Sequence, residues 1–563
     1  MTQPINYDVT ERNGHVTEQT KPRHATQKTI LVALVLSCVV LFSLYIRVAD
    51  YGFYEDDYWA IVPWFKTPPT QLWALTVSHV ETWPTGRPLN HILPKWFSWL
   101  GYHLAGIQGI YFLGFLVHSL NAFLIYLLLR RWLGHWSAVL AGFFLVLLPA
   151  DTTRIIPLFT AHVHPSLTFL LVALLVNRTR CWVASYPIAA LSLLSYETAF
   201  LPFIVFPLFF ADRRRRLFRW LVHLASCGMV LVLVFGIRLR LGDARANSVI
   251  PGLGEVLWRS LSSMWIGPET SLKTLVKAIL EGPHAPTPFA FLFAGLVVLL
   301  LFALPKLLRE TPGSPDEVSN RSRSLTVFLA GVASWIFAYA LTLTNYPPTQ
   351  EAGRLTSTHI AAVFGLACAF AGATDYLRSF SRPLKIAATT VVTVLVGLLT
   401  LYSFRVQAGY AIAWEQERRF WRRVVELCPD ITADTRIILT GREPEQNEFI
   451  LGNSWADVLV LQNIFTTGGT PILWYYDGFA KAADIRFENG QVTWKPIFWS
   501  DKREVLNLND IIILQASGDT MLRIGELRIP EMPFPLHTKP APLLQTPHSS
   551  ATLTSFGRFL LRP

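Results

Sequence analysis

The sequence predicts a polytopic α-helical membrane protein that carries a soluble α/β domain at its C-terminal end. Hydrophobic residues make up 52% of the 563 residues and charged residues only 15%, whereas a soluble globular protein carries about 25% charged residues. Apolar runs recur as far as residue 403, and beyond it the pattern changes to short strand-like runs. These observations exclude an ordinary soluble protein.

About eleven apolar segments approach the roughly 20 residues that a transmembrane helix requires. They cover residues 29–47, 106–129, 136–150, 158–176, 182–196, 198–211, 218–238, 287–304, 325–344, 358–374 and 384–403. Basic residues gather in alternate connections, as the positive-inside rule requires of cytoplasmic loops. These groups are Arg130 with Arg131, Arg178 with Arg180, Arg213 to Arg216, Lys306 to Arg323, and Arg378 to Lys385. An odd number of spans then places the tail outside.

The chain divides into three parts on this pattern. We expect a disordered cytoplasmic segment over residues 1–28, a membrane core over 29–403 and an extracytoplasmic α/β domain over 404–563. Residues 50–105 form a long first outer loop rich in tryptophan, which predicts amphipathic helices in the membrane interface. A second outer loop, residues 239–286, has the same character.

The C-terminal part opens with a charged segment, residues 415–427, that predicts a helix. Strands are predicted at residues 436–439, 458–461, 485–487, 491–494 and 510–514. Asn489-Gly490 is typical of a hairpin turn between two of them. Residues 530–548 are rich in proline and predict an extended loop.

The net charge of +11 does not indicate a nucleic-acid partner. Acidic and basic residues nearly balance after residue 404, so the surplus lies in the membrane part, where basic loops set the topology. The five cysteines are scattered and predict no disulfide framework. No Cys/His spacing suits a zinc site.

Three consecutive carboxylates, Glu55, Asp56 and Asp57, follow the first apolar segment. Because a charge in hydrocarbon costs several kcal/mol, roughly 3 or more, such a cluster is either a solvated loop or a working site at the membrane surface. Aromatic residues surround it, and Trp and Tyr prefer the membrane interface. The flanks therefore favour a working site over a solvated turn.

Further polar groups fall on the same predicted side of the membrane. Arg87 and His91 lie later in the first loop, Glu197 lies at a tight turn, and Arg354 precedes another span. A weaker candidate group on the same side contains Arg154, His162 and His164. A carboxylate can accept the proton of an attacking hydroxyl, and arginines can contact a departing phosphate bidentately. The set suits transfer of a group from a phospholipid-like donor.

The layout resembles the GT-C superfamily of integral-membrane glycosyltransferases, in particular its protein O-mannosyltransferase and aminoarabinose transferase group. Residues 56–61 (DDYWAI) resemble the Asp-Asp-x-x-Ala-Ile stretch of transmembrane and tetratricopeptide-repeat O-mannosyltransferases. Residues 86–89 (GRPL) resemble their Arg-Pro-Leu motif. Glu197 and residues 351–357 are similar to two later motifs, the second with Ala-Gly between acid and arginine. No tetratricopeptide repeats follow, and the aminoarabinose transferases have Asp-Glu where this chain has Asp-Asp.

The resemblance implies a glycosyltransferase that moves a sugar from a polyprenyl-phosphate donor to a hydroxyl of a glycan, lipid or protein, with inversion. Asp56 is then the expected base, supported by Asp57 and Glu55. The substrate-binding candidates are Arg87, His91, Glu197, Arg354, Arg154 and His164. No metal site is predicted, although the three carboxylates could offer oxygens to Mg²⁺ or Mn²⁺. The expected location is the outer face of a bacterial plasma membrane.

Two other classes stay open at this level. A transporter or flippase of lipid-linked saccharides would place ionisable residues near the midplane on paired broken helices, which the sequence does not display. In a non-catalytic envelope assembly protein, the tail would carry the function and the acids would be replaceable. Structural roles are also open: Arg87 could anchor the loop, Glu197 could cap a helix and Arg354 could pair with Glu351.

Overall fold

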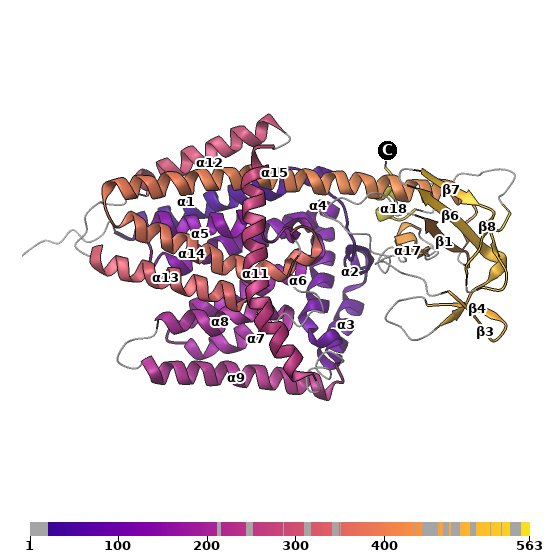
Figure 1. Cartoon of the computed structure of the whole chain (residues 1–563), viewed down its shortest axis with the longest axis horizontal. Coiled ribbons are helices and arrows are strands. Elements are labelled where there is room, and N and C mark those ends of the chain that lie inside the picture. The colour runs from indigo at the N-terminus through magenta and orange to yellow at the C-terminus, as the bar shows by residue number, and fades with distance from the viewer. Residues whose placement is uncertain are drawn as a thin grey trace, which may run out of the picture.

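Figure 1 shows a long bundle of helices with a small β-rich domain at one end, in a computed structural model of the whole chain. The prediction of a polytopic helical core followed by an α/β domain is confirmed. The structure describes residues 21–562 apart from 211–215, 244–251, 285–286, 309–316, 341–347, 350, 433, 442–459, 466–471, 475–484, 496–502, 518–519, 531 and 541–552. Most of the predicted N-terminal segment therefore lies outside the described residues.

The core contains helices at every predicted apolar segment within the described residues. They are α1 (Lys21–Val40), α4 (Pro88–Leu129), α5 (His135–Leu147), α6 (Pro157–Val176), α7 (Ser185–Ser195), α8 (Leu201–Val205), α9 (Arg216–Arg240), α11 (Leu253–Glu281), α12 (Pro288–Leu307), α13 (Glu317–Phe337), α14 (Ile360–Arg378) and α15 (Arg382–Leu427). The amphipathic second loop is mostly α11, which runs across the other helices (Figure 1).

Seven helical segments of the described part are long and apolar enough to cross a membrane. They are Thr26–Asp50, Pro88–Leu129, Pro157–Val176, Arg216–Arg240, Pro288–Leu307, Arg354–Arg378 and Arg382–Leu427. Three further apolar helices are shorter. One of them, α5, has 13 residues, so it rises only about 20 Å, less than the roughly 30 Å hydrocarbon core. The expected number of eleven spans is therefore not confirmed.

Two helices are much longer than the spans predicted for them. Helix α4 has 42 residues and bends at Ala105 and Gly106, where the backbone leaves helical geometry. Its first half belongs to the first outer loop and its second half to the predicted span. Helix α15 has 46 residues, or about 69 Å, so it extends well beyond a bilayer. The predicted last span and the predicted charged helix are one continuous rod.

The basic connections gather at one end of the bundle. The Arg130 side chain lies 3.2 Å from the Thr29 hydroxyl, and Arg321 donates to the carbonyl of Ser379. The acidic cluster and the C-terminal domain lie at the other end, where α15 finishes (Figure 1). This separation of charge agrees with the predicted sidedness, while the direction of the chain across a membrane stays a prediction.

The first outer loop packs into the protein more deeply than its aromatic composition suggested. It contains α2 (Asp57–Ala60), η3 (Val62–Trp64), α3 (Pro69–Thr82) and η4 (Pro84–Gly86). Tyr51 and Tyr54 are fully buried and donate to Gln407 and to the Tyr410 carbonyl on α15. These aromatic residues therefore anchor the loop to α15, whereas Trp73 on α3 is 63% exposed and suits the interface.

The C-terminal domain is built on a four-stranded sheet of order β2-β1-β6-β7. Strands β1 (Arg436–Gly441), β2 (Ile472–Trp474) and β6 (Ile511–Ser517) are parallel, and β7 (Thr520–Ile524) is antiparallel. Two smaller sheets contain β3 (Arg486–Glu488), β4 (Gln491–Trp494), β5 (Glu504–Val505), β8 (Glu526–Leu527) and β9 (Leu536–His537).

The predicted hairpin at Asn489-Gly490 is present between β3 and β4, and both turn residues have positive φ, as its turn type requires. The strand predicted at 458–461 is wrong where it is described, because helix α17 (Val460–Ile464) begins there. Residues 458–459 lie outside the described part. Three apolar residues of α17 turn inward in a helical pattern: Val460, Leu461 and Ile464.

Candidate functional site

The three consecutive carboxylates lie on a tight turn between the first helix and α2. Glu55 has a φ of 49°, a conformation that non-glycine residues rarely adopt. The turn directs Asp57 inward, where it is fully buried. Its two oxygens accept the backbone N–H groups of Tyr54 and Leu158, at 2.9 and 2.8 Å. Asp57 therefore fixes the turn and joins it to the first turn of α6.

Asp56 and Glu55 face a single cation. Arg354 donates to the Asp56 carboxylate at 2.5 Å and to the Glu55 carboxylate at 3.0 Å. Arg354 begins a short helical turn, η11 (Arg354–His359), that leads into α14. Nearly 300 residues separate these partners in the chain, so the helical core brings them together. Arg354 thus balances part of the negative charge of the buried turn.

A cavity of about 270 Å³ opens beside this pair. Loop one contributes Asp56 and Arg87, and the other walls come from α4, α6, the turn after α7, and η11. The charged and hydrogen-bonding side chains that line it are those of Asp56, Thr85, Arg87, Asn90, His91, Lys95, His162, Tyr196, Arg354 and Ser357. Four of the predicted site residues, Asp56, Arg87, His91 and Arg354, therefore meet in one cavity.

Glu197 holds Arg87 in position. Arg87 donates to its carboxylate through two nitrogens, at 2.5 and 2.7 Å, and Arg238 contacts it at 3.3 Å. Arg238 is itself paired with Asp243 at 2.6 Å. The Arg87 head also lies 5.2 Å from the centre of the Tyr196 ring. Glu197 therefore positions Arg87, and it also lies in the first turn of η7 (Glu197–Phe200), so the helix-capping role stays open.

His91 is joined to a small cationic group at the mouth of the cavity. Its ring nitrogen lies 3.1 Å from the Thr85 hydroxyl. Lys95 donates to the His91 carbonyl at 2.8 Å and lies 3.1 Å from His79. Lys95 is only 6% exposed. This buried amine lines the same cavity as Arg87 and Arg354, which are both paired with carboxylates.

Two of the predicted site residues lie elsewhere. Arg154 donates to the backbone carbonyls of Val146 and Leu148. His164 lies 3.5 Å from Asp151, and both line a separate, smaller cavity. They share a sequence neighbourhood with His162, which does reach the main cavity. For His164 the reason is helical geometry, because residues two apart on α6 point to different sides; Arg154 lies before α6, on η5 (Thr153–Ile155).

The turn carboxylates do not converge on a metal site. Both carboxylate oxygens of Asp57 accept hydrogen bonds from backbone N–H groups. The carboxylates of Glu55 and Asp56 face Arg354. Within the described residues, no group of three His, Cys, Asp or Glu side chains is arranged to hold a metal ion. The donor set therefore does not fit the Mg²⁺ or Mn²⁺ that the sequence left open.

The sequence reading missed Lys95 and Arg238. Lys95 lies on the amphipathic first half of α4, where a lone lysine is ordinarily a solvated residue. Arg238 ends an apolar helix, which is the usual place for a topology determinant. The available signal was burial: both are 6% exposed, and buried cations need partners. Only the tertiary structure supplies that information.

The helical core, the buried turn and the cationic cavity define a class, namely a polytopic membrane protein with an acid–arginine site at one end. Residues 87–237 match the sequence model of the family described as dolichyl-phosphate-mannose-protein mannosyltransferase. The matched segment includes Arg87, Glu197 and most of α4, α6, α7 and α9. The resemblance to GT-C membrane glycosyltransferases is therefore confirmed, and the match supports a glycosyltransferase.

The comparison with solved structures finds ArnT from Cupriavidus metallidurans, in an apo state and bound to undecaprenyl phosphate. For both, the identity is 12% and the TM-score 0.35, over 74% of this chain and 82% of that chain. At these values no residue role is transferred from ArnT. The comparison with curated proteins gives no match.

Proposed function

We propose that this chain is a membrane glycosyltransferase that moves a sugar from a polyprenyl-phosphate donor to a hydroxyl acceptor with inversion. The observation that carries the proposal is the meeting of Asp56, Arg87 and Arg354 in one cavity. The family match over residues 87–237 supports the same reaction class. The acceptor is a hydroxyl of a glycan, lipid or protein, and the reaction takes place on the outer face of a bacterial plasma membrane.

In this reaction the acceptor oxygen bonds to the anomeric carbon as the bond from that carbon to the phosphate oxygen breaks. The electron pair leaves with the phosphate, and the hydroxyl proton passes to the Asp56 carboxylate. The transition state resembles an oxocarbenium ion. The developing negative charge on the phosphate is met by Arg354 and Arg87, with Lys95 at the same wall.

The pairing of Arg354 with Asp56 links donor binding to the base. Arg354 lies 2.5 Å from the Asp56 carboxylate and so engages an oxygen that would accept the proton. A donor phosphate competes for the same guanidinium, because both anions use the planar fork of an arginine. Arrival of the donor therefore releases Asp56 to accept a proton. Glu55, the other partner of Arg354, keeps the cation near the site.

The test compares Asp56→Asn with Asp50→Asn in the purified full chain. Asp50 is a matched control because it is a nearby acid that pairs on the surface with Arg47. Each form receives a panel of radiolabelled polyprenyl-phosphate sugars with a membrane glycan and lipid extract. We expect transfer by Asp56→Asn to fall about 100- to 10,000-fold, the usual contribution of a general base.

Donor binding should survive in Asp56→Asn, and Asp50→Asn should behave like the wild type. Equal transfer by Asp56→Asn and wild type would remove Asp56 from the mechanism. If no form binds or transfers any sugar of the panel, and both variants support the same phenotype in cells, the glycosyltransferase proposal fails.

A further inference from the structure

A second and larger cavity lies at the opposite end of the helical core from the acidic turn. Its volume is about 440 Å³, and it is formed by the ends of α4 and α6, the start of α7, the η8 turn (Phe206–Phe210) and α9. This is the end where the basic connections gather. The proposed glycosyl transfer uses none of its residues, so its chemistry is a separate question.

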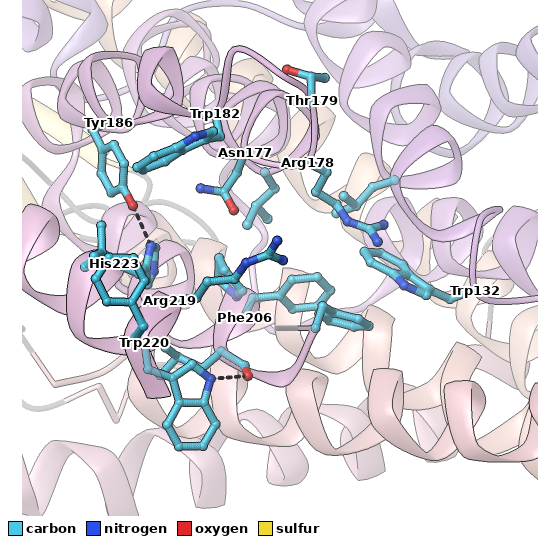
Figure 2. A pocket seen from close by; sticks show the side chains of 17 residues that line it. Trp132, Asn177, Arg178, Thr179, Trp182, Tyr186, Phe206, Arg219, Trp220 and His223 are labelled. Carbon is cyan, nitrogen blue, oxygen red and sulfur yellow. Dashed lines mark hydrogen bonds between the residues drawn. The ribbon is translucent and has the colours of Figure 1, made fainter. Parts of the chain in front are cut away.

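Two arginines supply the charge of this cavity. The Arg178 guanidinium lies over the Trp132 ring at 3.6 Å and also faces Phe210 at 5.7 Å. Figure 2 shows the head of Arg219 pointing into the same space, between Asn177 and Phe206. Among the described residues, neither arginine forms an ion pair with a carboxylate. Two guanidinium groups in one hollow favour an anion with several oxygens, such as a phosphate.

Apolar residues form part of the lining, beside the polar Asn177, Thr179, Tyr186 and His223, and continue onto the exposed face of α9. Leu128, Leu174 and Phe206 form the inner wall. On α9, Phe218 lines the cavity and is 68% exposed, and its neighbours Leu217 and Leu221 are 69% and 59% exposed. In a membrane-spanning helix such exposed apolar side chains face acyl chains. A ligand can therefore place its anionic head in the cavity and its tail along α9.

The aromatic residues give this cavity the character of a membrane interface. Trp132, Trp182, Tyr186 and Trp220 surround it (Figure 2). The Tyr186 hydroxyl is bonded to His223 at 3.1 Å, and the Trp220 indole donates to the Leu208 carbonyl at 2.7 Å. Trp and Tyr rings occupy the headgroup level of bilayers. The aromatic ring around the cavity therefore favours placement of the two arginines at the headgroup level.

We propose that this cavity binds the phosphate headgroup of an anionic membrane lipid between Arg178 and Arg219, with the lipid tail lying along α9. The inference does not depend on the proposed glycosyl transfer. Basic residues at the cytoplasmic ends of membrane helices attract anionic lipids electrostatically. What distinguishes this site from such a general attraction is the aromatic-lined cavity that holds both arginines.

The experiment measures lipid retention on the full chain by native mass spectrometry in detergent. Phosphatidylglycerol is titrated against phosphatidylcholine with the same acyl chains, and inorganic phosphate is tested as a competitor. The variant is Arg178→Gln with Arg219→Gln. The control is Arg382→Gln with Lys385→Gln, which removes the same charge from exposed residues outside the cavity. Arg178 and Arg219 are also exposed, so the variant should fold, and circular dichroism checks this.

We expect tighter binding of phosphatidylglycerol than of phosphatidylcholine in the wild type. The cavity variant should lose about ten-fold or more in affinity, the size of a charge-assisted phosphate contact, while the control stays within about two-fold. An equal loss in both variants would mean general surface attraction and overturn the proposal. Displacement of the lipid by inorganic phosphate would indicate a site for a soluble anion and would also overturn it.

Discussion

Asp56 and Asp57 are adjacent in the chain and have different surroundings. Asp56 lines the cavity and faces Arg354. Asp57 is fully buried and accepts two backbone N–H groups. Burial raises the pKa of Asp57 well above its usual value, the two N–H groups oppose this, and the nearby charges of Asp56 and Glu55 add to it. The two acids therefore have separate environments, which agrees with the proposed function: Asp56 is the base and Asp57 supports the turn.

Substitution of Asp57 by Asn tests this division of roles. An amide replaces one acceptor oxygen by a donor, so one backbone N–H loses its partner, at a cost of about 1–3 kcal/mol. We expect Asp57→Asn to lower the thermal stability of the detergent-solubilised chain. Asp56→Asn should lower the melting temperature less, because Arg354 keeps Glu55 as a partner. Similar melting temperatures for both variants would contradict the structural role of Asp57.

Glu197 supports a second prediction at this scale. Removal of the Glu197 carboxylate leaves the buried positive charges of Arg87 and Arg238 with less negative charge nearby. Breaking a buried ion pair by removing one partner costs about 3–5 kcal/mol. Glu197→Gln should therefore lower the melting temperature clearly, whereas Glu81→Gln on the exposed face of α3 should stay within about 0.5 kcal/mol. No difference between the two would remove Glu197 from the support of Arg87.

At the scale of elements, α15 connects the membrane core, the first outer loop and the C-terminal domain. Tyr51 and Tyr54 of the loop bond to residues on α15, and Tyr58 reaches Glu417 at 3.3 Å. Gly52 makes this packing possible, because a Cβ there would lie 1.9 Å from a ring atom of Trp414. The acidic turn is therefore positioned by a helix that begins at the other end of the core.

Charged contacts join the C-terminal sheet to the segment just after α15 and also stabilise the domain internally. Arg523 on β7 contacts Asp430 at 2.7 Å, and Lys539 contacts Asp510 at 2.5 Å. Burial raises the pKa of Asp430, but the hydrogen bond and charge of Arg523 outweigh it and leave the pKa lowered. Burial also raises the pKa of Asp510, but hydrogen bonds from Lys539, Thr435 and Thr432 outweigh it and leave the pKa lowered.

These shifts predict acid sensitivity of the domain. Each folded-state pKa lies below the unfolded value of about 3.9, so the stabilisation is complete above that value and is lost as the pH falls through the folded-state pKa. Between pH 5 and pH 3, roughly bracketing that value, the wild type should lose more stability than Asp430→Asn with Asp510→Asn. The control Asp434→Asn, on an exposed residue, should follow the wild type. Parallel pH profiles would contradict the prediction.

At the scale of the whole molecule, the C-terminal domain is part of the site's support. Asn463 on α17 donates to the Tyr58 carbonyl at 2.8 Å. On α18 (Ser555–Leu560), Phe556 packs against the rings of Phe53 and Tyr58. Ser555 accepts a hydrogen bond from Tyr102 on α4 at 2.9 Å. Two short helices of the tail thus cover the back of the loop that carries the carboxylates.

Phe556→Ala should therefore loosen the acidic turn, although Phe556 lies far away from it in the chain. Loss of a buried phenylalanine costs about 3–5 kcal/mol, and here part of that loss falls on the packing of loop one. We expect faster hydrogen exchange in residues 51–61 and reduced transfer, with strand β6 still protected. The control Leu522→Ala changes a side chain that is 63% exposed. If hydrogen exchange in residues 51–61 is unchanged in Phe556→Ala, the tail does not support the packing of the acidic turn.

The amino-acid sequence did not predict strands β2, β5, β7, β8 or β9, and it predicted a strand at 458–461 where α17 begins. It did predict the membrane class, the positions of the apolar helices, the strands at 436–439, 485–487, 491–494 and 510–514, and the acid and arginine motifs. These features follow from local composition and periodicity, which one segment carries alone. It could not determine the number of spans, because short apolar helices such as α5 look like spans until their length is compared with a bilayer.

Only the tertiary structure decided which motifs meet. Arg354 joins Asp56 across nearly 300 residues, Lys95 and Arg238 enter the site network, and Arg154 and His164 turn away from it. The tail packs behind the acidic turn, and no local sequence pattern in either segment predicts this contact. The physical reason is the same in each case: burial and ion pairing depend on which side chains the packed helices bring within a few ångströms.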